Sequence, residues 1–334
     1  MKNKFVRNTI ILSCIAAFCI FIPTILIKFD IIIDAYIAQL LTLSGVNAIM
    51  ALSVNMICGI TGQLSLGQAG FMAIGAYATV LLTEAGVPLP VSTLIAAVIT
   101  AILGFLIGFP VLKLEGDYLA IVTLAFGEII RVLLINLKGI TGGPNGKQFV
   151  TILCLDPTLA YLVIISVMIL LIVLVQNFIR STYGRSILAV REDEIAANSS
   201  GIPVFKYKML GFVIASFIAG IGGALYVMLI GFVKPDQAAF TKSIDYLIYV
   251  VLGGMGSTTG SVLAAFVLTF LQEVLRFLKD FRLLVYPVIL VIVMLFRPQG
   301  LLGTKEMSFV KTFDWIKNGG FKTLFSKKNK KEAE

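Results

Sequence analysis

The chain has 334 residues, of which 58% are hydrophobic and 13% are charged, with a net charge of +9 and a mean hydropathy of +0.99. A soluble domain carries about 25% charged residues, so this composition excludes a water-soluble globule and predicts an all-α integral membrane protein. The absence of histidine also excludes histidine general bases, histidine-liganded metals and Ser-His-Asp triads.

The first predicted membrane span is Asn8–Ile27, an uncharged segment between Arg7 and Lys28. The alternative is a cleaved leader, since Ser13 and Cys14 weakly resemble a lipoprotein cleavage site. The apolar run continues well past Cys14, however, and no A-x-A site closes it. We therefore expect an uncleaved first span.

Further spans follow from the rule that a bilayer core about 30 Å thick needs roughly 20 mostly apolar helical residues. Two of the candidates, Ile244–Met255 and Leu283–Phe296, are short, so each is expected to be tilted, extended or re-entrant. With these two, the sequence predicts a polytopic helix bundle of about ten transmembrane or re-entrant segments, including broken helices. The remaining candidates are Tyr36–Cys58, Leu64–Thr83, Val91–Leu112, Tyr118–Leu137, Thr158–Phe178, Met209–Phe232 and Thr259–Leu275.

Lysine and arginine predict the orientation of the bundle. Placing the N-terminus in the cytoplasm puts most of these residues inside, including five between Arg180 and Lys208 and nine from Arg297 onward. The positive-inside rule therefore predicts cytoplasmic N- and C-termini. The lysines and arginines expected in outside loops are Lys28, Lys138, Lys147, Lys234, Lys242, Lys279 and Arg282.

We divide the chain into a transmembrane domain, 1–303, and a basic cytoplasmic tail, 304–334. The tail could touch anionic membrane lipid, although a solvated end is the simpler interpretation, and no nucleic-acid-binding module is present. Two glycine-rich segments, 142–147 and 254–260, lack the spacing of nucleotide-binding loops. The four cysteines have no CxxC spacing, so we expect no metal, no cofactor and no catalytic residue, and any ATP would bind another chain. The cysteines are Cys14, Cys19, Cys58 and Cys154.

Two glycine-rich segments, Gly59–Gly70 and Gly253–Gly260, interrupt apolar runs. Transporters use such interruptions to expose backbone groups and helix termini to a solute. The alternative is a pair of tight turns at the membrane surface. Because the first segment carries more polar side chains than a turn requires, we interpret it as part of a substrate pathway, and we assign the second segment to the same pathway. The predicted pathway residues are Gln63, Ser65, Gly67, Gln68, Gly254 and Gly256.

Charged and small residues inside the spans predict helix packing. Glu128 and Arg131 share one helical face. Because each charge would be costly alone in hydrocarbon, we predict that the two form an intramembrane ion pair facing the bundle interior. Glu273 and Arg276 repeat this spacing nearer a membrane surface. Small residues recur every four positions and predict close helix contacts. These are Gly104 and Gly108, followed by Ala215, Ala219 and Gly223 beside Ser216, Gly220 and Ala224.

The longest inside loop, 180–203, has a mixed charged and apolar pattern. Residues 187–197 are predicted to form a helix, which Gly201 and Pro203 would end. Such a surface helix suits docking onto a cytoplasmic partner, and a helix lying on the lipid surface is the alternative.

Glu194, the Ala196-Ala197 pair and Gly201 have the spacing of the cytoplasmic coupling loop of ABC importer permeases, which this loop resembles. Three further regions extend the likeness, and all four together resemble the LivM-type permease of branched-chain amino acid importers over about residues 35–303. Gln68 stands where histidine is often expected in that family. The regions are Thr61–Phe71 through Gly75–Tyr77, Tyr118–Arg131 with Thr141–Gly146, Gly184–Gly201, and Gly253–Ser257 with Phe296–Leu302.

The resemblance implies a multi-pass cell-membrane subunit that is itself not an enzyme. It implies four partners: a second, LivH-like permease, two cytoplasmic ATPase subunits that hydrolyse ATP, and an extracytoplasmic solute-binding protein that delivers leucine, isoleucine or valine. Permeases of the same family that move urea or short amides are the alternative substrate class. The residues implied at the ATPase contact are Arg191, Glu194, Ala196, Ala197 and Gly201.

Two other functions remain open from the residues alone. A self-sufficient secondary transporter would need proton or sodium coupling, and the scarcity of intramembrane carboxylates argues mildly against protons. A lipid-modifying enzyme would need paired aspartates, a metal cluster or a nucleophile with its base, none of which the sequence offers in a loop.

Overall fold

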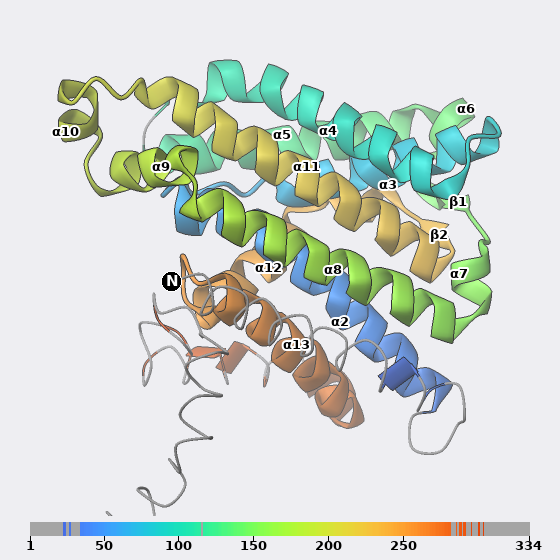
Figure 1. Cartoon of the computed structure of the whole chain (residues 1–334). Helices are drawn as coiled ribbons and strands as arrows, with labels where there is room; N and C mark the ends of the chain where they lie inside the picture. The colour runs from blue at the N-terminus through green and yellow to red at the C-terminus, as the bar shows by residue number, and fades with distance from the viewer. Residues whose placement is uncertain are drawn as a thin grey trace, which may run out of the picture.

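The computed structural model describes residues 34–114 and 116–281, together with positions 23, 24, 27, 285, 287, 288, 290, 291, 295, 300 and 303. These residues form a bundle of helices with one short pair of strands (Figure 1). The predicted span Asn8–Ile27, most of Leu283–Phe296 and the tail 304–334 lie outside the described residues.

Among the described residues, six segments are long and apolar enough to cross a membrane. Helix α2 continues into a π-helix, η1, and α13 continues into a 3-10 helix, η4. The helices that make these segments are α2 (Ala35–Val54) with η1 (Asn55–Ile60), α4 (Leu89–Val111), α5 (Asp117–Asn136), α8 (Pro157–Arg180), α11 (Val204–Ile230), and α13 (Thr258–Val274) with η4 (Leu275–Phe281).

Shorter elements complete the described chain. Helices α3 (Gln68–Glu84) and α12 (Phe240–Gly253) have 17 and 14 residues, and each follows an irregular segment. The others are α6 (Lys138–Thr141), η2 (Gly143–Asn145), β1 (Lys147–Gln148), α7 (Ile152–Leu155), α9 (Thr182–Glu192), α10 (Glu194–Ser199), β2 (Phe232–Val233) and η3 (Pro235–Ala238).

Helix α11 is the centre of the bundle, where it packs against α2, α3 and α4. The small residues predicted to allow close packing do so. A Cβ atom added to Gly223 would lie 1.9 Å from the Met72 carbonyl oxygen of α3, and one added to Gly220 would lie 2.1 Å from Thr100 Oγ1 of α4. Larger side chains here would force the helices apart, because helix association in a membrane depends on close van der Waals contact.

The bundle has two distinct ends (Figure 1). Helices α9 and α10 lie at one end, which we call the α9 end. Strands β1 and β2 lie at the other, the β end, and pair antiparallel with Lys147 opposite Val233. Helix α8 runs from the β end to the α9 end, and α11 returns.

Three sequence predictions need correction. The third span does not begin at Leu64 but at Gln68, because residues 61–67 form no helix and the Leu66 amide donates to Thr123 of α5. The helix predicted over 187–197 is two helices, because Asp193 caps a second one with its side chain. Lys242 lies in α12 and not in a loop, because α12 already begins at Phe240.

Candidate functional site

The first interruption starts where α2 widens into the π-helix η1. The amide of Thr61 donates to the Met56 carbonyl at 3.2 Å and that of Gln63 to the Ile57 carbonyl at 3.0 Å, so the last turns are wider than an α-helix allows. Gly62, at φ +71°, then ends the helix in the left-handed region that favours glycine. Single π-helical turns are rare and often occur at functional positions.

The polar side chains predicted to line a pathway are buried here. Gln68 is 0% exposed, and its Oε1 accepts a hydrogen bond from Ser53 Oγ at 3.0 Å. Gln63 and Ser65 are 6% and 2% exposed. In the described part of the chain, Gln63 Oε1, Ser65 Oγ and Gln68 Nε2 have no hydrogen-bond partner. Buried polar atoms without partners are costly, so this concentration marks the interruption as a candidate functional region.

Two distant helices hold the segment that follows. The Leu66 amide donates to Thr123 Oγ1 of α5 at 3.0 Å, and the Ala69 amide donates to Ser243 Oγ of α12 at 3.1 Å. Gly67 lies so close to α5 that an added Cβ would be 2.7 Å from the Thr123 carbonyl oxygen. The beginning of α3 is therefore held by side chains from elsewhere in the bundle.

The second interruption is a tight turn between α12 and α13. Gly254 and Gly256 have φ values of +107° and +93°. The Ser257 amide donates to the Gly254 carbonyl at 3.0 Å, while its hydroxyl accepts from the Gly260 amide at 3.1 Å and caps α13. This turn is therefore closed mainly by its own residues.

The two interruptions meet. Asn55 Oδ1 of η1 accepts a hydrogen bond from the Gly256 amide at 2.9 Å. A Cβ added to Gly59 would lie 2.4 Å from that same amide nitrogen, so only glycine permits the contact.

Arg191 of α9 packs across this junction. A Cβ on Gly62 would lie 2.8 Å from Arg191 Cγ, and one on Gly256 would lie 3.0 Å from Arg191 Nη1. The arginine side chain therefore touches both interruptions from the α9 end of the bundle.

The remaining loop residues divide between inward and outward positions. Ala197 is buried, whereas Ala196 and Gly201 are exposed and Glu194 forms an ion pair with Lys208 at 2.5 Å. The Asp193 side chain accepts hydrogen bonds from the Ile195 and Ala196 amides and so caps the start of α10. Ile195, which sequence reasoning did not place in the site, is 81% exposed at the outer surface of α10.

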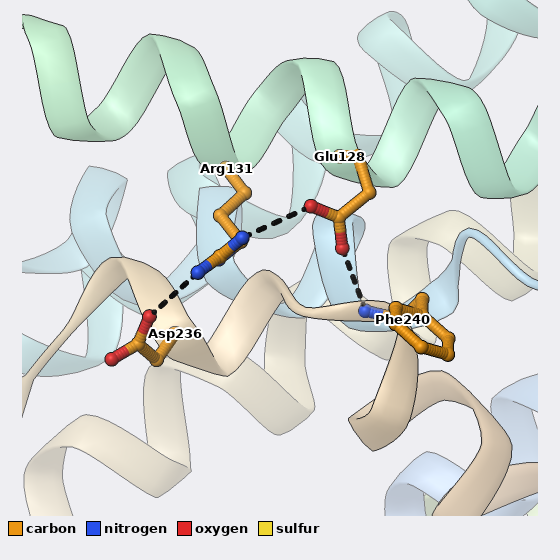
Figure 2. A network of polar contacts seen from close by, with 4 residues as sticks. All are labelled: Glu128, Arg131, Asp236 and Phe240. Carbon is orange, nitrogen blue, oxygen red and sulfur yellow. Dashed lines mark hydrogen bonds and ion pairs between the residues drawn. The ribbon is translucent and has the colours of Figure 1, made fainter.

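Glu128 and Arg131 lie 3.2 Å apart on α5 and extend into a longer network (Figure 2). Arg131 also reaches Asp236 of η3 at 3.2 Å, and Glu128 accepts from the Phe240 amide at the start of α12 at 3.0 Å. A carboxylate at a helix N-terminus is stabilised by the helix dipole. Sequence spacing could not have found Asp236 or Phe240, which lie about a hundred positions away.

Comparisons with known proteins identify the family. The family described as "Branched-chain amino acid transport system / permease component" matches residues 36–296. The high-affinity branched-chain amino acid transport system permease protein LivM of Escherichia coli (strain K12) is 39% identical over 291 residues, covering 78% of this chain and 68% of that protein. The chain belongs to this family.

More distant relatives include both kinds of permease in the family. The probable branched-chain amino acid transport permease protein LivM of Methanocaldococcus jannaschii is 24% identical, covering 81% of this permease chain and 94% of that protein. The LivH permease of Escherichia coli (strain K12) is 25% identical, covering 80% and 95%. No solved structure matches this chain.

Proposed function

We propose that this chain is the membrane-spanning permease subunit of an ATP-driven, binding-protein-dependent importer that moves branched-chain amino acids into the cytoplasm. The α9 end faces the cytoplasm together with both chain termini. Residues 1–303 form the permease domain with about ten membrane segments, and 304–334 form a basic cytoplasmic tail. The 38–39% identity to two LivM proteins supports this substrate class over urea or short amides.

The observation that carries the proposal is the position of Arg191. Its side chain packs against Gly62 in one interruption and Gly256 in the other. A movement of α9 is therefore transmitted directly to both broken helices, as an importer driven by ATPase subunits at its cytoplasmic face requires. Arg191 acts in this account as a positioning residue between the docked ATPase and the transport pathway.

The outer surface of α10 is the proposed docking site for an ATPase subunit. Ile195 exposes a large apolar side chain at 81% beside the exposed Ala196, and Gly201 follows at φ +79°. Contiguous apolar surface rimmed by polar residues is typical of protein-binding sites, and Ile195 with Ala196 forms a small apolar surface within an otherwise polar loop. Glu194, held by Lys208, fixes the orientation of this surface.

The interruptions are the proposed pathway elements. Buried polar atoms of Gln63, Ser65 and Gln68 lie along the first, and Gly67 lets that segment approach α5. Gly254 and Gly256 allow the turn of the second. Irregular backbone at membrane depth is tolerated only against protein or a water-filled cavity, which supports a role of this region in conduction.

The partners are a second, LivH-like permease, two ATPase subunits and an extracytoplasmic binding protein, and ATP hydrolysis takes place on the ATPase subunits. Purification of the tagged chain from its native membrane in mild detergent tests this assembly. We expect stoichiometric recovery of an ATPase and a second permease by mass spectrometry. If neither is recovered, even after crosslinking before solubilisation, the chain is a self-sufficient transporter and the proposal is wrong.

Substitution of the docking surface tests the position of the ATPase. Ile195→Asp should abolish co-purification of the ATPase while the second permease is still recovered. Leu155→Asp is the matched control, because Leu155 is 74% exposed at the β end of the bundle. Normal recovery of the ATPase with Ile195→Asp would exclude α10 as its binding site.

A further inference from the structure

A polar cavity of about 230 Å³ lies between α2, α12 and α13, apart from the two interruptions. It is nearer the β end, because its walls also include Tyr226 in the last turns of α11 and Gln237 of η3, which lie on either side of β2 in the chain. Sites for drug-sized ligands measure about 300–1,000 Å³. A cavity somewhat below that range suits a small solute.

One wall of the cavity is a loosely held pair of opposite charges. Lys242 Nζ and Asp245 Oδ2 of α12 lie 3.7 Å apart, whereas charge-assisted hydrogen bonds measure about 2.7–2.9 Å. Among the described residues, Lys242 is the only ion-pair or hydrogen-bond partner of Asp245. Glu273 of α13, also at the cavity, is held by Tyr36 and by Arg276 at 3.1 Å. The α12 pair is therefore the charged element best able to accept a ligand.

The part of the lining that comes from α2 is apolar at Leu40 and Leu43 and ends in the amide of Asn47. Leu40 and Leu43 line the cavity from neighbouring positions on one face of α2. Asn47 follows one turn later and donates to Thr269 Oγ1 at 3.0 Å. A cation, an anion and an aliphatic surface thus face a single small space.

We propose that this cavity binds a free α-amino acid with an aliphatic side chain during transport. Lys242 contacts the carboxylate of the solute, Asp245 contacts its ammonium group, and Leu40 and Leu43 receive its side chain. The inference rests on the proposed importer function. It places recognition of the solute's carboxylate and ammonium groups in this cavity and not at the two interruptions.

The competing account is a purely structural ion pair between neighbouring turns of one helix. The two accounts differ for the variant that removes both charges. A structural pair this exposed, with side chains 55% and 34% accessible, contributes little to stability, so removing both charges should leave uptake close to normal. A zwitterion site loses a further ligand contact with each substitution.

The experiment measures L-leucine uptake by the complete importer in proteoliposomes with its binding protein. Lys242→Gln and Asp245→Asn should each lower the initial uptake rate by about tenfold or more, and the double variant should be at least as impaired. ATP hydrolysis should continue in all three. Lys234→Gln is the matched control, because Lys234 is an exposed lysine beside β2, and it should transport normally.

Recovery of uptake in the double variant, or normal uptake in either single variant, would overturn the assignment. Absence of leucine uptake by the unmodified complex would instead refute the proposed function, so the two failures are distinguishable.

A second measurement tests the proposal even if the Lys242 and Asp245 variants fail to assemble into the complex. Asn47→Cys in the purified complex should be labelled by a water-soluble thiol reagent more slowly in L-leucine than in isocaproate, which lacks the ammonium group. Equal labelling rates would likewise overturn the proposal.

Discussion

The two helix interruptions differ in how they are stabilised. The turn at Gly254–Ser257 is closed by its own serine cap and its own backbone. The segment at 61–69 is instead held by Thr123 of α5 at Leu66 and by Ser243 of α12 at Ala69, and it carries buried polar atoms without partners in the described region. The turn at Gly254–Ser257 is therefore closed chiefly by local bonds, with Asn55 as its partner from η1, whereas the segment at 61–69 depends more on the arrangement of the bundle.

We propose that this difference gives the two interruptions different parts in transport. A segment held by distant helices changes when those helices move, whereas a locally capped turn moves as a unit. Their contact through Asn55 and Gly256, with Arg191 packed on both, lets the rigid turn act on the adjustable segment. The following substitutions, from the largest expected effect to the smallest, test that contrast.

Gly59→Val should have the largest effect, because it separates the two interruptions. Even the Cβ of alanine would lie 2.1 Å from Asn55 Oδ1 and 2.4 Å from the Gly256 nitrogen. Overpacking of this kind costs about 1–3 kcal/mol or more, so we expect a large fall in the thermal unfolding midpoint in detergent for Gly59→Ala and no folded protein for Gly59→Val. Gly139→Ala, with no atom within 4 Å of the added Cβ, is the control.

Thr123→Val should have the second largest effect, because it removes the hydrogen bond by which α5 holds the first interruption. The Leu66 amide would lose its acceptor in a partly buried position, at a cost of about 1–3 kcal/mol. Thr93→Val is the matched control, since that hydroxyl bonds only to a carbonyl of its own helix in the described structure. Equal destabilisation by the two variants, measured as unfolding midpoints, would contradict a special role for Thr123.

Ser257→Ala should lower the free energy of unfolding by about 1 kcal/mol, because the α13 cap is lost, whereas Ser257→Gly should lower it by only a few tenths of a kcal/mol. Hydrogen exchange should quicken at the first turn of α13 and stay unchanged at residues 61–67. Faster exchange in both segments would show that the second interruption is not locally determined.

Gln68→Met should change stability least, by about 0.5 kcal/mol or less. The substitution removes one hydrogen bond but also an amide nitrogen that is buried without a partner, and Ser53 still donates to the Ala215 carbonyl at 2.7 Å. Uptake should nevertheless fall strongly if Gln68 belongs to the pathway. Gln39→Met, at an exposed position of α2, should leave uptake unchanged, and an equal result at Gln68 would remove it from the pathway.

Local sequence predicted the features that depend on local chemistry. Apolar runs located the long helices, glycine clusters located both interruptions, and the i,i+3 spacing placed Glu128 beside Arg131. The break at Asp193 also had a local signal, since aspartate is a preferred helix N-cap. The prediction of a single helix over 187–197 rested on the apolar positions and gave no weight to this capping signal.

Features that depend on tertiary packing were not predictable from spacing. The resemblance to importer permeases put Arg191 at the ATPase contact, yet its side chain packs inward on Gly62 and Gly256. Asp236 joins Arg131 because η3 lies against α5, which no local pattern encodes. The cavity residue Lys242 was predicted in a loop because the apolar run begins only at Ile244, although α12 already begins at Phe240.

The most direct test of the account is the ratio of L-leucine imported to ATP hydrolysed by the reconstituted importer carrying Arg191→Gln. Arg185→Gln is the control, because Arg185 lies on the same helix and its guanidinium donates to the Arg180 carbonyl at the end of α8 and to the Thr182 hydroxyl at the start of α9. The account predicts that the ratio falls by about tenfold or more for Arg191→Gln, with ATP hydrolysis retained, and is unchanged for Arg185→Gln. An unchanged ratio for Arg191→Gln would contradict the claim that this side chain links the ATPase contact to the two interruptions.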